Sequence, residues 1–140
     1  MTDERYPEEI LDEYQDDGTM PERVATLAEA VIGRRIVSAE EGPVEGGYYR
    51  RTGLILTLDD GRKVTLVDNG DCCAYTELQG FFLDPSSVDH MILGVGTTDE
   101  YTTWHIFADF GDIMRLEVGW SAGNVGYYTY GFDINVIEAG

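Results

Sequence analysis

The chain has 140 residues and a formal net charge of −18, from 27 acidic and 9 basic side chains. This length fits one domain with its own hydrophobic core, and an apolar fraction of 43% is that of a globular protein. The charge argues against direct binding of nucleic acid or anionic membranes, because both require clustered Lys and Arg.

The first 18 residues form an acidic lead-in without the apolar core of a signal peptide. No run in the chain approaches the ~18 apolar residues of a membrane span, so we expect a cytoplasmic protein. The many carboxylates of residues 1–18 predict a solvated, partly mobile segment. Residues 19–140 are expected to form a single α+β domain.

The first predicted element is a helix over about residues 20–32. Thr19 and Glu22 have the spacing of a capping box, and Pro21 suits the first helical turn. Apolar side chains then recur every three or four residues and predict a stripe that packs on a sheet: Val24, Leu27, Ala28, Val31 and Ile32. Gly33 is expected to end the helix in a left-handed conformation.

A two-residue period follows the helix and predicts strands over 35–40, 48–58 and 63–67, with a Gly- and Pro-rich loop over 41–47. The register of the second and third strands fixes the turn between them. A three-residue turn over 59–61 with a left-handed glycine keeps one face apolar, whereas a two-residue turn would mix the faces. In the favoured register Leu56 lies opposite Val64, and Leu54 lies opposite Leu66.

The last third of the chain has the clearest strand pattern. Strands over 103–110, 113–120 and 127–136 share one phase and are joined by turns, which predicts an antiparallel meander. A strand over 88–95 carries bulk on both faces and is expected to be central. We therefore predict an α+β fold that is mostly antiparallel β. It has about seven strands in a curved sheet or small barrel, with the N-terminal amphipathic helix packed on it.

Four motifs occur in order: LTLDDG at 56–61, GDCCA at 70–74, WHIFAD at 104–109 and GYYTYGF at 126–132. As a set they resemble a family of small acidic proteins from actinobacteria and their bacteriophages, known only as a domain of unknown function. The resemblance covers about residues 33–137. It implies a mostly β fold and a phage or prophage setting, and it implies no catalytic residues.

Two thiols and a carboxylate meet only in the stretch 70–75. Cys72 and Cys73, with His90 and His105, are ligand types that zinc accepts, although adjacent cysteines lack the usual spacing. A cysteine paired with either histidine would be a nucleophile, but the acidic neighbours of the thiols disfavour the thiolate. A metal- or small-ligand-binding domain, or a cysteine-dependent enzyme, is therefore the alternative function. We expect no resident cofactor and interpret the stretch as a structural hinge of small residues.

Tyrosines near loops predict an exposed aromatic patch of Tyr127, Tyr101, Tyr48 and Tyr49. Tyr is favoured at protein interfaces, and an acidic surface suits a basic partner approached by electrostatic steering. We therefore predict a non-catalytic accessory protein of phage type that binds a host macromolecule, most simply a basic protein. Acidic mimicry of DNA is a further alternative.

Overall fold

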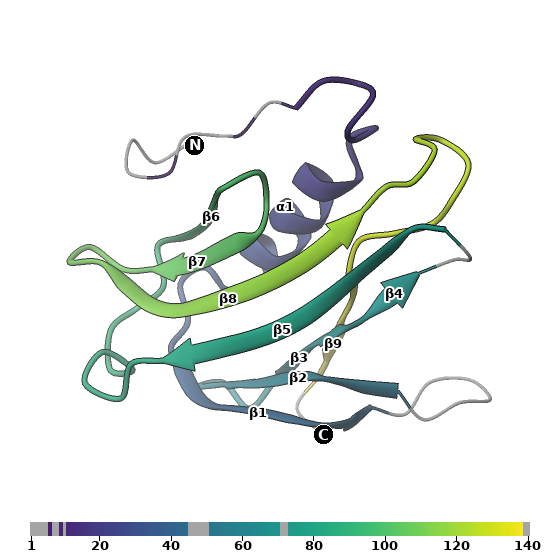
Figure 1. The fold of residues 1–140 in the computed structure, drawn as a ribbon. Helices are drawn as coiled ribbons and strands as arrows, with labels where there is room; N and C mark the ends of the chain where they lie inside the picture. Colours follow the sequence, from purple (N-terminus) through teal and green to yellow (C-terminus); the bar gives the residue numbers. More distant parts are fainter. Residues whose placement is uncertain (1–5, 7–8, 10, 45–50, 71–72, 139–140) are drawn as a thin grey trace.

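Figure 1 shows the computed structural model, in which the described part of the chain forms two antiparallel sheets and one helix. The structure describes residues 6, 9, 11–44, 51–70 and 73–138. The helix is α1 (Thr19–Val31). The strands are β1 (Ile36–Val44), β2 (Arg51–Leu58), β3 (Lys63–Val67), β4 (Asn69–Gly70), β5 (Tyr75–Leu83), β6 (Gly94–Thr98), β7 (Thr103–Phe107), β8 (Asp112–Ser121) and β9 (Asp133–Ile137). The mostly antiparallel β fold with one helix is confirmed, with nine strands in the described part rather than about seven.

One sheet has the strand order β1-β2-β3-β9, and the other has the order β4-β5-β8-β7-β6. The chain passes from the first sheet to the second between β3 and β4, where a single residue, Asp68, separates the two strands. Its carboxylate accepts the N–H of Leu78 in β5 at 2.9 Å, which ties the crossing to the second sheet. The change of sheet thus comes just before the stretch 70–75 that the sequence predicts as a hinge. That stretch instead links β4 and β5 within one sheet, and Asp71 and Cys72 fall outside the described residues.

The register predicted for the β2–β3 hairpin is confirmed. Leu56 pairs with Val64 and Leu54 with Leu66, and Gly61 has φ +89°. All four apolar side chains are completely buried. Local turn chemistry and the demand for one apolar face therefore specify this hairpin.

Helix α1 buries the side chains of Met20, Leu27 and Val31 completely. Ile32, predicted as part of the same stripe, is 50% exposed because the helix ends at Val31 and the chain turns away. Gly33 has φ +82°, as expected for a left-handed helix stop. Within the described residues, the helix is too short and too polar to cross a membrane.

The start of α1 is held by two aspartates rather than by the predicted capping box. Asp16 Oδ1 accepts the N–H of Met20 at 3.2 Å. Asp17 Oδ1 accepts both the N–H of Thr19, at 3.2 Å, and its hydroxyl, at 2.6 Å. Thr19 already belongs to the helix and its hydroxyl is engaged, so the capping side chains come from the preceding residues.

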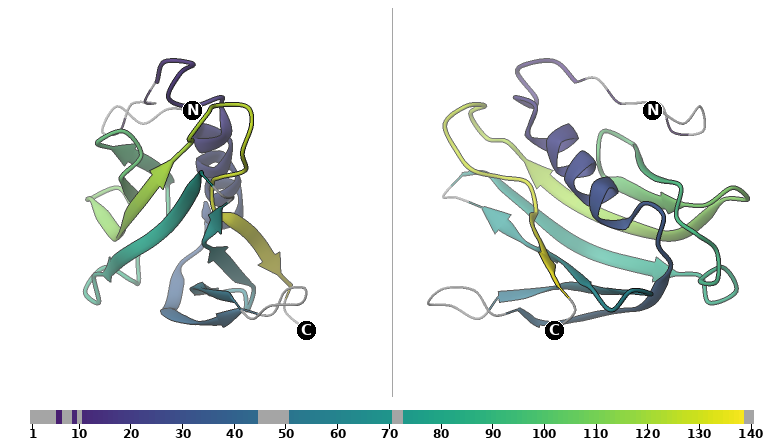
Figure 2. Two further views of the ribbon diagram at one scale, coloured as in Figure 1. Left: turned by 45° about the vertical axis from the view of Figure 1, so that its right-hand side comes forward. Right: turned by 180° about the vertical axis from the view of Figure 1, so that it is seen from behind.

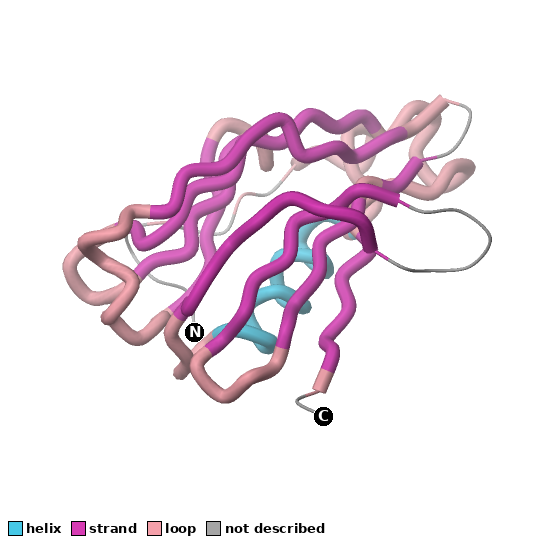
Figure 3. The backbone as a smooth tube through the Cα atoms, turned by 90° about the horizontal axis from the view of Figure 1, so that it is seen from below, coloured by secondary structure: helices cyan, strands magenta, loops and turns pink. Residues whose placement is uncertain are grey.

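The helix contacts β6 and β9, which are edge strands of the two sheets. Figure 2 shows α1 lying across the side at which the sheets diverge, and Figure 3 shows the same arrangement from below. The core therefore lies between two curved sheets and the helix. Trp104 of β7 and Phe132, which meet edge to face with centroids 5.4 Å apart, are completely buried there.

Two strand predictions are wrong. The central strand expected over 88–95 is instead a turn-rich segment followed by the edge strand β6, because Asp84 bonds to Ser86 and Ser87 and starts a series of turns. The third strand of the expected meander, β9, pairs with β3 in the other sheet. A long connection between β8 and β9 carries it there, with three glycines at positive φ. The loop predicted over 41–47 is also partly wrong, because β1 continues to Val44.

Candidate functional site

The most exposed large hydrophobic side chains in the described part of the chain are Tyr14, at 84%, and Tyr127, at 83%. Tyr14 lies in the turn before α1, among the exposed carboxylates of Asp12, Glu13 and Asp17. Tyr127 lies in the connection between β8 and β9, which neighbours that turn in Figures 1 and 2. We call these five residues the tyrosine end. It combines two solvated phenol rings with negative charge.

The two loops of the tyrosine end are joined by Tyr130, whose side chain is buried. Its hydroxyl lies 2.6 Å from Asp16 Oδ1 and 2.8 Å from Asp17 Oδ1, and accepts the N–H of Asp17 at 3.1 Å. The ring stacks on Trp120 with centroids 5.9 Å apart. Burial and then the Asp16 carboxylate raise the pKa of Tyr130, so the phenol keeps its proton. The exposed tyrosines are therefore presented by loops that are fixed to each other.

Of the two members of the predicted aromatic patch that the structure describes, one lies on the surface. Tyr127 is exposed, as predicted, but Tyr101 is 2% exposed. Tyr101 is buried because its hydroxyl donates to the backbone oxygen of Glu9 at 2.6 Å, which turns the ring inward. Tyr48 and Tyr49 lie outside the described residues. The structure adds Tyr14, which the sequence patterns did not single out.

The predicted metal set is not brought together in the described residues. Cys73 is exposed at the start of β5, whereas His90 lies beyond the other end of that strand, against Phe110. The nine residues of β5 lie between them in the chain, and a strand of this length spans roughly 30 Å. His105, in β7, forms hydrogen bonds with Thr98 and Asp112 instead. No group of three or more candidate ligands occurs among the described side chains, and Cys72 lies outside them.

His105 joins a chain of hydrogen bonds on the outer face of the second sheet. Its Nδ1 lies 2.8 Å from Asp112 Oδ2, and its Nε2 lies 2.8 Å from Thr98 Oγ1. A carboxylate only accepts, so Nδ1 donates to Asp112, and Nε2 of a neutral ring then accepts from the Thr98 hydroxyl. Hydroxyl, imidazole and carboxylate follow in the order used to activate a hydroxyl nucleophile.

Tyr6 covers this chain. Its ring stacks on the imidazole of His105 with centroids 4.2 Å apart and planes 14° apart, and it lies 5.3 Å from the ring of Phe107. Its hydroxyl donates to Asp112 Oδ1 at 2.6 Å. His105 is 8% exposed as a result. The geometry therefore makes the His105 chain an anchor for the N-terminal segment rather than an open catalytic centre.

Glu9 makes a second anchor three residues further on. Its carboxylate accepts the N–H groups of Glu100 and Tyr101, at 2.8 and 2.9 Å, and the hydroxyl of Thr97 at 2.8 Å. Asp99, Glu100 and Tyr101 all have positive φ, between 56° and 63°, which aims successive N–H groups at one point. Such a backbone turn favours an anion. The β6–β7 loop is thus a carboxylate-binding turn, occupied by Glu9.

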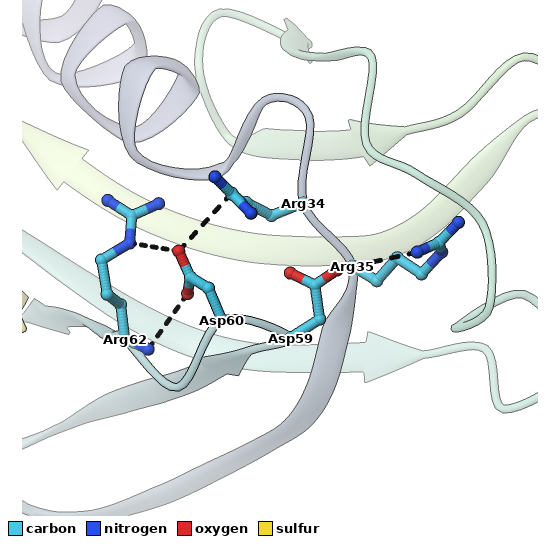
Figure 4. A network of polar contacts seen from close by, with 5 residues as sticks. All are labelled: Arg34, Arg35, Asp59, Asp60 and Arg62. Atoms are coloured by element: carbon cyan, nitrogen blue, oxygen red, sulfur yellow. Dashed lines mark hydrogen bonds and ion pairs between the residues drawn. The ribbon is translucent and has the colours of Figure 1, made fainter. Parts of the chain in front are cut away.

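Figure 4 shows a network of ion pairs at the C-terminal end of α1, opposite the tyrosine end. Asp60 Oδ2 lies 2.6 Å from Nε of Arg62 and 3.5 Å from Nε of Arg34, while Arg35 lies 3.7 Å from Asp59. These side chains fix the β2–β3 turn against the chain that leaves the helix. Ion pairs this exposed stabilise a fold only weakly, so we assign them a structural role.

Four large apolar side chains in the segments that follow α1, β5 and β7 are about half exposed: Ile32, Met91, Leu93 and Phe110. The segments that carry them are connected: Gly33 donates its N–H to Ile92, and Ile92 donates to Arg34. The ring of Phe110 contacts that of His90, with centroids 4.3 Å apart. We call these four residues the apolar corner. It lies at the helix end opposite the tyrosine end.

The sequence patterns pointed to His105 but missed its partners and the N-terminal residues that bind them. Tyr6 and Glu9 are hidden in an acidic segment whose composition indicates solvent exposure. The strand glycine Gly96 was the available signal, since an isolated glycine in a strand often marks a close approach. A Cβ atom at Gly96 would overlap the side chain of Tyr6.

The described residues form a mostly antiparallel β fold with one helix, and their most exposed aromatic side chains lie in loops. Comparison with known families finds that residues 29–134 match DUF7448, a domain of unknown function. The chain belongs to this family, which confirms membership of an uncharacterised family. No curated protein and no solved structure matches the chain.

Proposed function

We propose that this protein is a non-catalytic accessory protein that binds a basic protein partner through the tyrosine end. The observation that carries the proposal is the exposure of Tyr14 and Tyr127, each above 80%, on loops held together by Tyr130. The resemblance to proteins of actinobacteria and their phages supports a host protein as the partner and a phage or prophage as the setting.

Tyrosine suits this role because its ring offers a large, rigid contact area with a polar tip. Both loops are fixed through Tyr130, so little conformational freedom would be lost on binding. The net charge of −18 would steer a basic partner toward the molecule, and Asp12, Glu13 and Asp17 place negative charge on the loop that carries Tyr14. Aromatic contact and electrostatic attraction thus act at the same place.

The proposal is tested by capture from a lysate of an actinobacterial host on the immobilised protein. Wild type, the double variant Tyr14→Ala/Tyr127→Ala and the control Phe110→Ala are compared. Phe110 is a matched exposed aromatic, at 52%, in the apolar corner. We expect wild type and Phe110→Ala to retain a basic protein, and the double variant to bind it at least about tenfold more weakly. Capture should also weaken between about 0.05 M and about 0.5 M salt.

Other results would contradict this function. Equal capture by wild type and the double variant would remove the tyrosine end from the account. Loss in Phe110→Ala alone would move the interface to the apolar corner. Capture of DNA-binding proteins that added duplex DNA displaces would favour DNA mimicry instead.

A further inference from the structure

The N-terminal segment occupies a site that the rest of the molecule builds. We call Tyr6, Glu9 and the side chains and N–H groups that bind them the strap site. The binding groups described above come from residues 96–112, in β6, β7, the loop between them and the first residue of β8. Residues 29–134 match the domain family, so the binding groups lie inside the family domain and the two occupying residues lie outside it.

The seat for the tyrosine is specific. The imidazole of His105 provides a stacking surface, and Asp112 accepts the phenol hydroxyl at 2.6 Å. Gly96 pairs with His105 across β6 and β7, and it leaves the space that the tyrosine fills. The seat therefore recognises both the face of the ring and its hydroxyl.

The seat for the carboxylate is held open by the body of the protein. Trp104 Nε1 donates to the backbone oxygen of Tyr101 at 3.0 Å, and Trp120 Nε1 donates to that of Glu100 at 2.8 Å. The two indoles thus bind the carbonyl oxygens of the β6–β7 loop, while the N–H groups of the same loop donate to Glu9. Thr97 and Tyr101, which also bind Glu9, are 5% and 2% exposed. The loop conformation thus rests on contacts other than those with its occupant.

From these contacts we infer that the strap site is a peptide-recognition site for a segment with a tyrosine followed three residues later by a glutamate. The chain's own N-terminal segment fills it in cis, and a partner segment of the same pattern can take its place. A tethered occupant has an effective concentration in the millimolar range, so a competing segment binds well only where the cis occupant is weakened. This site is separate from the tyrosine end and does not depend on the function proposed above.

The test uses fluorescence anisotropy of a labelled synthetic peptide of residues 1–12 added to the full-length protein. The receiving variant is Tyr6→Ala/Glu9→Gln, which removes the ring and hydroxyl from the first seat and the negative charge from the second. We expect it to bind the peptide saturably and at least about tenfold more tightly than wild type does. A scrambled peptide, and peptides with the tyrosine replaced by alanine or the glutamate by glutamine, should not bind. Both partners are acidic, so non-specific charge attraction does not contribute.

Two glycine variants in the receiving background locate the binding. Gly96→Ala fills the tyrosine seat and should abolish binding. Gly80→Ala, in a strand position where a Cβ meets nothing closer than 3.9 Å, should leave binding unchanged. Circular dichroism and a cooperative melt establish that each variant is folded. The single variant Glu9→Gln, which removes one charge, is the receiver if the double variant does not fold.

The inference is overturned if a folded receiver shows no saturable binding, or if wild type binds as tightly as the receiver. It is also overturned if the scrambled peptide binds equally or if Gly96→Ala has no effect. The strap site would then be an internal packing contact only. None of these results bears on capture of a partner by the tyrosine end, so the two proposals can fail separately.

Discussion

Gly126 and Gly131 have the same backbone conformation, with φ +89°, but different surroundings. A Cβ atom on Gly126 would meet nothing within 4 Å, whereas one on Gly131 would lie 2.8 Å from Thr19 Cγ2 and 3.0 Å from Arg23 Cγ. Because Gly131 has no side chain, the β8–β9 connection can approach the helix closely. This approach places Tyr130 beside Asp16 and the start of α1.

Alanine substitutions at the two glycines separate backbone strain from close packing. Gly126→Ala should lower the free energy of unfolding by about 1 kcal/mol, the cost of a left-handed non-glycine residue. Gly131→Ala should lower it by about 2–4 kcal/mol, because the methyl group also displaces the helix. Urea denaturation measures both. Equal losses would show that the approach to the helix is not tight.

Asp17 predicts an acid-dependent stability. The hydroxyls of Thr19 and Tyr130 hold the pKa of Asp17 below its ordinary value of 3.8. A carboxylate with a lowered folded-state pKa stabilises the fold fully above its unfolded pKa, and this contribution is lost as the pH falls through the folded-state value. Acidification from about pH 5 to about pH 2 should therefore lower the Tm of wild type more than that of Asp17→Asn. Parallel pH profiles of Tm would contradict this assignment.

At the scale of elements, the end of α1 determines which side chains support the core. Leu27 is completely buried, while Ile32 is half exposed after the helix ends. Leu27→Ala should lower the free energy of unfolding by about 2–5 kcal/mol, and Ile32→Ala by less than about 1 kcal/mol. Chemical denaturation checks the pair. A similar loss at both positions would mean that the helix continues through Ile32 in solution.

Elements set by local interactions could be predicted from the sequence. The helix over 20–32 and the hairpin register at Leu56 and Val64 depend on periodicity and turn residues a few positions apart. The partner of β9 could not be predicted, because the same alternation suits either sheet and a long connection decides between them. Solvent exposure of Tyr127 followed from strand parity, even though its segment is not a strand.

The contacts of the candidate sites that the sequence did not predict also join residues far apart in the chain. Tyr6 meets His105 and Glu9 meets Tyr101 across more than 90 residues of sequence, so no spacing rule connects them. The division at residue 18 between an acidic lead-in and a domain stays a prediction. Within that lead-in, Tyr6 and Glu9 contact the second sheet, and Asp16 and Asp17 bond to Tyr130.

At the scale of the whole molecule, helix α1 joins two sheets and separates two surfaces of different chemistry. Its first turn lies at the tyrosine end, which carries exposed carboxylates and two exposed rings. Its last turn lies at the apolar corner, beside the arginines of Figure 4. A basic partner should therefore bind at one end of the helix and leave the other end free.

Amide hydrogen exchange of the protein, alone and with the captured basic partner, tests most directly whether the partner binds at the tyrosine end. Contact at the tyrosine end predicts slower exchange over residues 12–17 and 122–130, with no change around Met91, Leu93 and Phe110. Slower exchange confined to the apolar corner, or no difference between the free and bound protein, would contradict the account.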